Sequence, residues 1–440
     1  MLKRKKYNEL LEWKDKKDKE CLLIKGARQV GKTFLVQRFG ENEYKSFIEI
    51  NFLREPNCKE IFNGSLNPQD IYKKLSIIKP NSKLIEHETL IFLDEIQMCS
   101  SARTALKFLA EDNKYDIIAS GSLLGLHYGM DSNKEVEEIE SIPVGYESQM
   151  VMYSMDFEEF LWANGYSDET IATLRGYFES GEKIPKVINE KFENLFREYI
   201  VVGGMPEVVQ TFVNTTNFGE VKKKQAKILA SYDDDIANHA KKVERSKIRA
   251  CYNSLPSQLA RENKNFSYAA VEKGTGSKKY GDSITWIRDA NLVNACFNVN
   301  EPQIPLLGNQ KDKSFKLYIN DTGLLMSMYG DAAKRLILEN EMKGNAKGGI
   351  YENVIAELLV KNGYNLHFYS TPNNSQEIEF IIEKDAEIIP IEVKAGNTAT
   401  LSLNSYIEKY NPSVAYKLIN GNIGKGSPKY TLPHYMVMFI

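Results

Sequence analysis

The chain has 440 residues, of which 42% are hydrophobic and 26% charged, and its formal net charge is −2. This composition is typical of a globular protein, and the length suggests two or three domains. The charge balance excludes a polycation, so any nucleic-acid surface must come from a local excess of basic residues. The five cysteines include no C-x-x-C pair, which argues against a zinc site or a disulfide framework and suits a reducing cytosol.

The basic N-terminus is not a signal peptide, because Tyr7-Asn8-Glu9 follow it where an apolar run would be needed. No apolar stretch elsewhere is long enough to span a bilayer. We therefore expect a cytoplasmic protein without a membrane partner.

The strongest motif is Gly26-Ala27-Arg28-Gln29-Val30-Gly31-Lys32-Thr33, which fits the phosphate-binding loop G-x-x-x-x-G-K-[ST] of P-loop NTPases. The apolar run at 22–24 before it predicts a buried strand, and the amphipathic residues 34–39 after it predict a helix. Lys32 is expected to reach the β- and γ-phosphates of ATP, and Thr33 to bind Mg²⁺. The expected contacts of this segment with the nucleotide are Gly26, Ala27, Gln29, Val30, Gly31, Lys32, Thr33 and Phe34.

Further apolar runs at 47–52, 90–93, 117–119 and 150–153 alternate with helical patterns. This alternation predicts a parallel sheet covered by helices. The run at 90–93 ends in Asp94-Glu95, which is typical of a Walker B motif. Asp94 is expected to hold Mg²⁺ through water, and Glu95 to polarise the attacking water. The alternative is an acidic junction between a strand and a loop.

Three more polar residues near these runs, Ser120, Ser122 and Arg103, are considered for the site. Ser120, or in second place Ser122, is expected to sense the γ-phosphate, unless Ser120-Gly121-Ser122 is an ordinary turn. Arg103 lies in a helical pattern after Asp94-Glu95, where it would stabilise transition-state charge. A solvated surface arginine is its simpler interpretation, and the sequence assigns no arginine finger.

The middle of the chain combines a chain break with an excess of basic residues. Two glycines before a proline, in Gly203-Gly204-Met205-Pro206, predict a bend, interpreted as a hinge between core and lid. Residues 221–280 contain 14 Lys and Arg against 6 Asp and Glu. Amphipathic pieces at 257–260 and 284–287, with the glycine-rich 274–281 between them, permit a helix-turn-helix or winged-helix module that binds DNA. The alternative is a basic helical face that is merely solvated.

The C-terminal part begins with a shift in composition at 344–349, which predicts a flexible joint before a helix from Tyr351 to Lys361. Apolar segments around a turn at Lys384-Asp385 predict a hairpin. Glu392 and Lys394 alternate with apolar residues, so they project from one face of their strand. Glu379 lies on the preceding strand and Glu352 at the start of the helix.

Three carboxylates and one lysine on one site would suit the hydrolysis of a phosphodiester. Glu352, Glu379 and Glu392 would hold one or two Mg²⁺ ions that polarise the scissile phosphate. Lys394 would orient the attacking water or stabilise negative charge. The alternative is a hairpin with an exposed polar face and a cross-strand ion pair.

These segments together resemble a family of bacterial and archaeal AAA-type ATPases with a C-terminal restriction-endonuclease-like domain of unknown function. The resemblance covers nearly the whole chain. The matching segments are 26–33, 93–97, 120–122, 157–161, 202–207, 316–325 and 391–394. The implied fold class is α/β, with an AAA core and its parallel sheet (1–165), a helical and winged-helix-like lid (166–343), and an α/β nuclease-like domain of the PD-(D/E)xK type (344–440).

The resemblance also implies site residues. It gives nucleotide-binding roles to Gly31, Lys32, Thr33 and Asp94, and nuclease roles to Glu352, Glu379, Glu392 and Lys394. The nuclease pattern usually has aspartate where this chain has Glu379, which is one methylene longer. This difference would shift a metal by about an ångström, enough to impair catalysis.

Two classes of function follow. In the first, ATP hydrolysis moves the basic lid and the C-terminal site cleaves DNA. In the second, the protein is a nucleotide-controlled switch whose C-terminal domain holds a nucleic acid or a protein partner without cutting. A homo-oligomer is compatible with both.

Overall fold

The computed structural model describes residues 2–17, 19–122, 147–371, 376–396 and 401–440. Their contacts divide the chain into two compact units. The first unit comprises Lys3–Tyr153 and Tyr232–Arg245, and the second comprises Ser154–Ser231 and Ser246–Ile440 together with the N-terminal end. The division into three domains at residues 165 and 343 stays a prediction.

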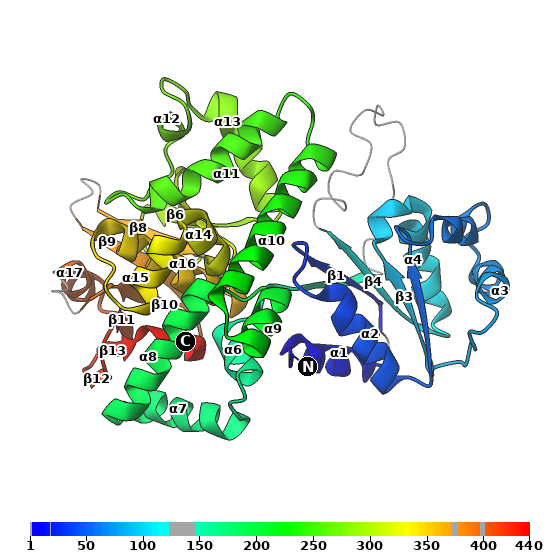
Figure 1. Ribbon diagram of the computed structural model, residues 1–440, viewed down its shortest axis with the longest axis horizontal. Coiled ribbons are helices and arrows are strands. Elements are labelled where there is room, and N and C mark those ends of the chain that lie inside the picture. The colour runs from blue at the N-terminus through cyan, green and yellow to red at the C-terminus, as the bar shows by residue number, and fades with distance from the viewer. Residues whose placement is uncertain (1, 18, 123–146, 372–375, 397–400) are drawn as a thin grey trace. The chain divides into compact units, whose positions relative to one another are not determined.

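The first unit is built on a five-stranded parallel sheet in the order β2-β3-β4-β1-β5, with helices packed beside it (Figure 1). β3 and β4 are buried along their whole length, which explains the continuous apolar residues 90–93 in β3 and 117–119 in β4. The predicted parallel sheet is therefore confirmed. Its elements are α1 (Lys6–Lys14), β1 (Cys21–Gly26), α2 (Lys32–Glu43), β2 (Ser46–Asn51), η1 (Pro56–Phe62), α3 (Pro68–Ile78), β3 (Thr89–Asp94), η2 (Ile96–Met98), α4 (Ser100–Asp112), β4 (Asp116–Ser122) and β5 (Glu147–Val151).

The second unit begins with helices, and the last part of one of them belongs to the first unit. α10 is a continuous helix, but its residues from Tyr232 onward group with the first unit. The helices are α6 (Phe157–Ala163), α7 (Asp168–Ser180), α8 (Lys186–Val202), α9 (Pro206–Thr215), α10 (Phe218–His239), α11 (Arg245–Leu259), α12 (Tyr268–Val271) and α13 (Ser277–Asp289).

The rest of the second unit surrounds an eight-stranded mixed sheet in the order β12-β13-β11-β10-β9-β8-β6-β7. β8, β9 and β10 are antiparallel neighbours, and β11 runs parallel to β10 after the crossover through α17. The elements are β6 (Val293–Val299), η3 (Leu306–Asn309), β7 (Gln310–Ile319), α14 (Thr322–Tyr329), α15 (Asp331–Leu338), α16 (Gly344–Lys361), β8 (His367–Ser370), β9 (Glu377–Lys384), β10 (Glu387–Val393), α17 (Leu401–Tyr410), β11 (Ala415–Ile419), β12 (Gly424–Lys425), β13 (Lys429–Pro433) and η4 (His434–Phe439).

The bend at the double glycine is confirmed, but its interpretation as a hinge between core and lid is wrong. α8 ends at Val202 and α9 begins at Pro206, and both helices belong to the second unit. A Cβ on Gly204 would lie 1.9 Å from the carbonyl oxygen of Met155. The Gly204 amide also donates to Asp321 over 2.8 Å. The glycines thus permit close packing inside one unit.

The predicted flexible joint at 344–349 is also wrong, because these residues form the first turns of α16. Gly349 packs against the carbonyl oxygen of Leu259, which a Cβ would approach to 2.0 Å. The glycine is needed for this helix packing. Glu352 consequently lies inside α16 instead of at its start.

Candidate functional site

The phosphate-binding loop connects the end of β1 to the start of α2. Gln29 and Gly31 have left-handed backbones with φ of 65° and 93°, and glycine adopts this conformation at little cost. A Cβ on Gly26 would lie 2.2 Å from the carbonyl oxygen of Met152, so this position also requires glycine. The loop therefore leads directly into a helix N-terminus, the geometry that binds phosphate groups.

Lys32 lies over this loop. Its Nζ donates to the carbonyl oxygens of Gly26 and Ala27 over 3.0 and 2.9 Å. Burial lowers the pKa of Lys32 to about 8, and the nearby carboxylates of Glu95 and Asp94 oppose this shift. A desolvated ammonium group that lies within hydrogen-bond distance of the loop is suited to bind an anion there.

Asp94, at the carboxyl end of β3, is buried and held by three neighbouring side chains. Its Oδ2 accepts hydrogen bonds from Thr33 Oγ1 over 3.0 Å and from Asn51 Nδ2 over 2.7 Å. Its Oδ1 accepts one from Ser120. Hydroxyl and carboxylate oxygens at this distance are ligands that Mg²⁺ accepts, directly or through water, so Thr33 and Asp94 fit the ion. The sequence analysis missed Asn51, although a polar residue at the end of a buried strand was its signal.

Glu95 follows immediately and has a left-handed backbone, with φ of 55°. This conformation is uncommon for a non-glycine residue and is often found at functional sites. Glu95 Oε2 accepts a hydrogen bond from Gln97 Nε2 over 2.5 Å. The Glu95 side chain is thus positioned by a partner just beyond the strand that carries Asp94.

Two arginines of the first unit have carboxylate partners. Arg103 Nη2 lies 3.7 Å from Glu147 Oε1, and the Arg103 side chain is only 13% exposed. The interpretation of Arg103 as a solvated surface arginine is therefore wrong. Arg28, inside the phosphate-binding loop, pairs with Asp235 of α10 over 2.7 Å. The sequence analysis missed this second contact.

In the second unit, three of the predicted nuclease residues meet on the β9–β10 hairpin. Lys394 Nζ lies 3.2 Å from Glu379 Oε1 and 3.2 Å from Glu392 Oε1. The Val393 amide also donates to Glu379 over 3.3 Å. Burial raises the pKa of Glu379 to about 7 against the opposing effect of Lys394, and burial likewise raises the pKa of Glu392.

Glu352 has different partners. It pairs with Lys264 over 2.9 Å and lies 3.8 Å from Lys316, and it accepts a hydrogen bond from Tyr318 over 3.2 Å. Burial alone would raise the pKa of Glu352, but Lys316 and Lys264 outweigh it and hold this pKa below its usual value. Lys316 pairs in turn with Glu377 over 2.6 Å.

These contacts do not fit a metal ion in the second unit. Each of the predicted metal ligands Glu352, Glu379 and Glu392 faces a lysine ammonium group. Among the described residues, no three His, Cys, Asp or Glu side chains are arranged to hold a metal. The three-carboxylate metal site stays a prediction.

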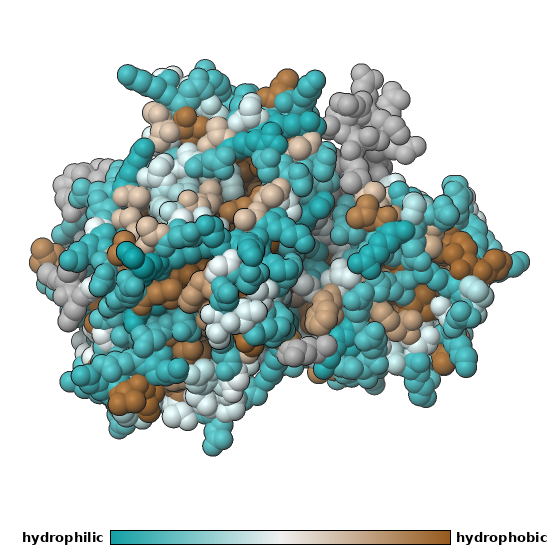
Figure 2. All heavy atoms as spheres, viewed as in Figure 1, coloured by the Kyte–Doolittle hydropathy of each residue, from teal (hydrophilic) through white to brown (hydrophobic). Residues whose placement is uncertain are grey.

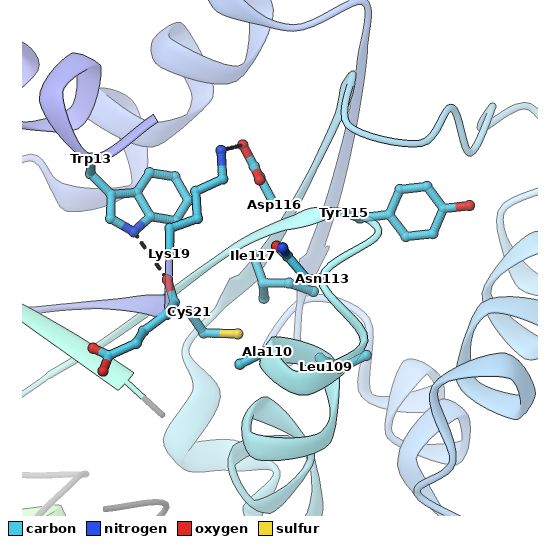
Figure 3. A pocket seen from close by; sticks show the side chains of 10 residues that line it. Trp13, Lys19, Cys21, Leu109, Ala110, Asn113, Tyr115, Asp116 and Ile117 are labelled. Atoms are coloured by element: carbon cyan, nitrogen blue, oxygen red, sulfur yellow. Dashed lines mark hydrogen bonds and ion pairs between the residues drawn. The ribbon is translucent and has the colours of Figure 1, made fainter. Parts of the chain in front are cut away.

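A small pocket of the first unit lies away from the phosphate-binding loop (Figure 3). Cys21 and Asp116 line it at the amino ends of β1 and β4, whereas the loop follows the carboxyl end of β1. Lys19 pairs with Asp116 over 2.7 Å, and Trp13 donates to the carbonyl oxygen of Glu20 over 3.0 Å. With about 10 Å³ of space, the pocket has room for one water at most. It is therefore no candidate nucleotide site.

The basic middle segment at 221–280 includes most of α10, all of α11 and α12 and the start of α13, and the antiparallel strands β6 and β7 follow α13. Its visible surface is mainly hydrophilic (Figure 2). Several of its lysines have acidic partners, including Lys222 with Asp331 and Lys279 with Glu272. Lys273 and Lys278 are exposed around the start of α13. The surplus of positive charge is therefore partly offset by acidic residues of the same unit.

The fold of the first unit, its phosphate-binding loop and the Asp94 network together define a P-loop ATPase domain. Residues 18–161 match the family model of an AAA domain. Residues 347–427 match a domain of unknown function (DUF4143), and residues 193–335 match another (DUF8612). The chain thus combines an N-terminal segment that matches an AAA domain with a C-terminal segment that matches the DUF4143 domain, as the sequence resemblance predicted. The restriction-endonuclease-like nature of the C-terminal domain stays a prediction.

Several solved structures are similar to the chain at low identity. One is the Walker-type ATPase of Pyrococcus abyssi, with 14% identity, 75% of this chain and 96% of that chain covered, and a TM-score of 0.41. Another is a STAND protein with a tetratricopeptide repeat sensor from Pyrococcus horikoshii, with 12% identity, 85% of this chain and 46% of that chain covered, and a TM-score of 0.27. A third is AMPPCP-bound DnaA from Aquifex aeolicus, with 15% identity, 64% of this chain and 86% of that chain covered, and a TM-score of 0.28. A search of curated proteins gives no match.

Among the described residues, no helix combines the length and the apolar character that a membrane crossing requires.

Proposed function

We propose that the protein binds and hydrolyses ATP with Mg²⁺ in the first unit and uses the nucleotide state to control its binding to DNA. The observation that carries the ATPase part is the arrangement of Lys32, Thr33, Asp94 and Glu95 around the phosphate-binding loop. In this proposal the C-terminal domain holds a nucleic acid or a protein partner without cutting it. Lys394 supports the non-cleaving role, because its ammonium group already forms ion pairs with both Glu379 and Glu392.

The residues of the first unit have distinct roles in the proposed hydrolysis. Backbone N–H groups of residues 27–33 and the Lys32 ammonium bind the phosphates. Mg²⁺ held by Thr33 and, through water, Asp94 would neutralise phosphate charge when it is bound. Glu95 accepts the proton of the attacking water, and Ser120 orients Asp94 through its hydrogen bond. This bond makes Ser120 a positioning residue, with γ-phosphate sensing as a further role.

The DNA-binding part of the proposal rests on α11, α12 and α13 with the β6–β7 hairpin. Three helices followed by two antiparallel strands are the order of a winged-helix module. Lys278 and Thr285 lie on the exposed side of α13, while Ile284 and Ile287 on the same helix are buried. A helix with one buried and one partly basic exposed side is suited to lie in a DNA groove.

We expect Lys278→Ala to weaken the binding of duplex DNA and to reduce the salt dependence of the affinity by about one phosphate contact. Fluorescence anisotropy of a labelled duplex over a range of salt concentrations measures both quantities. The matched control is Lys222→Ala, which removes an exposed lysine that pairs with Asp331. Equal salt slopes in the wild type and Lys278→Ala would contradict the assignment of α13.

The non-cleaving role of the C-terminal domain predicts that the purified protein leaves DNA intact. We expect no cleavage of linear, supercoiled or single-stranded DNA with Mg²⁺ or Mn²⁺, with or without ATP, from protein that still hydrolyses ATP. Gel electrophoresis of the DNA measures this outcome. Nicking that is present in the wild type and lost in Lys394→Ala would overturn the role and favour a nuclease instead.

A further inference from the structure

The ion pair between Arg28 and Asp235 joins the phosphate-binding loop to a distant part of the sequence. Arg28 Nε lies 2.7 Å from Asp235 Oδ1. The Asp235 side chain is 5% exposed, whereas that of Arg28 is 40% exposed. Asp235 lies near the end of α10, in the segment that belongs to the same compact unit as the loop. The carboxylate is thus a buried component of the nucleotide site.

Asp235 faces the same cations that a bound nucleotide would face. Arg28 and Lys32 are the positive groups in its surroundings, and Glu95 and the neighbouring Asp234 are the negative ones. The triphosphate of ATP would add several negative charges beside Lys32. Two anions near one pair of cations repel each other, and in a partly buried site this repulsion is only weakly screened.

We propose that Asp235 is an intramolecular competitor of the nucleotide phosphates for Arg28, so that binding of ATP displaces Asp235 from the phosphate-binding loop. Arg28 is the member of the pair that can turn toward the phosphates, because its side chain is the more exposed. Asp235 acts on the nucleotide through Arg28 and is a positioning residue. The inference rests on the proposed function of the first unit as an ATP-binding domain.

Displacement of Asp235 has a consequence for α10. Residues Tyr232 to His239 are the last two turns of the helix and group with the first unit, while the preceding residues from Phe218 group with the second. Loss of the ion pair removes a polar contact that ties these last turns to the loop. The end of α10 therefore loosens when ATP occupies the site, which gives the nucleotide a direct effect on a helix shared by both units.

The test compares the affinities of wild type and Asp235→Asn for MgATP. We expect the dissociation constant of Asp235→Asn to be about tenfold lower at pH 8, the change that loss of one competing ion pair produces. The matched control is Asp234→Asn, one residue earlier on the exposed side of the helix. It should bind MgATP within about twofold of the wild type. Asp235→Glu keeps the charge and should stay nearer to the wild type than to Asp235→Asn.

The pH dependence of this comparison separates competition from a merely structural role. Burial raises the pKa of Asp235 to about 6, with Arg28 opposing the shift and Glu95 adding to it. The competing charge is therefore complete at pH 8 and disappears as the pH falls through about 6. The ratio of the wild-type and Asp235→Asn dissociation constants should fall toward one below this pH. Protonation of ATP itself affects both proteins equally and cancels in the ratio.

Hydrogen exchange on the unmodified protein gives a second measurement that does not depend on the folding of a variant. A non-hydrolysable ATP analogue with Mg²⁺ should slow exchange in residues 27–35 and accelerate it in residues 232–239. Slower exchange in both segments would overturn the displacement of Asp235.

The outcomes distinguish the inference from the function on which it rests. A wild type that binds MgATP, with Asp235→Asn equal to it at pH 8, would overturn the competition alone. A wild type that binds no MgATP at any pH would overturn the ATP-binding function itself.

Discussion

Glu95→Gln is expected to bind MgATP as tightly as the wild type but to hydrolyse it about 10²–10⁴-fold more slowly, the usual contribution of a positioned general base. Glu95 follows β3 directly beside Asp94 and is held by Gln97, whereas Lys32 and Thr33 on α2 provide the proposed contacts with the phosphates and Mg²⁺. The substitution keeps the size of the side chain and removes only its basicity. Steady-state phosphate release and equilibrium nucleotide binding, measured on the same preparation, separate the two effects.

Lys32→Ala is the matched control because it should weaken nucleotide binding, which Glu95→Gln should leave unchanged. Truncation of a partly buried cation that binds an anion costs about 2–5 kcal/mol of binding free energy. We therefore expect Lys32→Ala to lose nucleotide binding and, as a consequence, turnover. Unchanged turnover in Glu95→Gln would exclude this residue as the base, and unchanged binding in Lys32→Ala would exclude the loop as the phosphate site.

The sequence predicts the first unit well because its signals are local. β1, β3 and β4 each contain a short apolar run, and β3 is buried at every position. The phosphate-binding loop is recognised from the spacing of its glycines, lysine and threonine, and Gly31 requires glycine because of its own left-handed backbone. Asp94 follows from its place at the end of a buried strand. Such features depend on residues adjacent in the chain.

The predictions that failed depend on contacts between distant segments. Gly204 and Gly349 have the composition of flexible joints, but each permits close approach to a carbonyl oxygen far away in the sequence. Arg103 has the pattern of a solvated arginine until Glu147 of β5 lies beside it. A single sequence gives no signal for these partners, since charge and spacing do not identify which distant carboxylate or carbonyl group will be close.

At the predicted nuclease site of the second unit, too, contacts within the hairpin were predictable and contacts with distant segments were not. The hairpin prediction brought Glu379, Glu392 and Lys394 together, and the alternation of residues along β10 sufficed for this. The partners of Glu352 were not predictable in this way. Lys264 follows α11 and Lys316 lies on β7, and only the pairing of β6 and β7 with the C-terminal sheet places them beside α16. These lysines give Glu352 ion-pair partners that lie outside the predicted hairpin.

Lys316→Met is expected to lower the free energy of unfolding of the second unit by about 3–5 kcal/mol at pH 7. The Lys316 side chain is 1% exposed and pairs with Glu377 over 2.6 Å, with Glu352 at 3.8 Å. Methionine fills nearly the same volume, so the loss comes from leaving Glu352 charged and buried with one cation fewer. Urea unfolding followed by the fluorescence of Trp162 and Trp286, both in this unit, measures the change.

The matched control and the pH dependence identify the cause of this loss. Lys222→Met removes an ion pair of the same 2.6 Å length, but its lysine is 55% exposed and its partner Asp331 65% exposed, so we expect a change of at most about 1 kcal/mol. Glu352 has a pKa below its usual value in the folded state, so its pairing stabilises the wild type above the unfolded-state pKa and is lost as the pH falls through the folded-state pKa. The difference between wild type and Lys316→Met should therefore stay constant from pH 7 down to the usual glutamate pKa of about 4.3 and shrink as the pH falls below it. A difference that is independent of pH would show that lost packing, rather than an unpaired carboxylate, destabilises the variant.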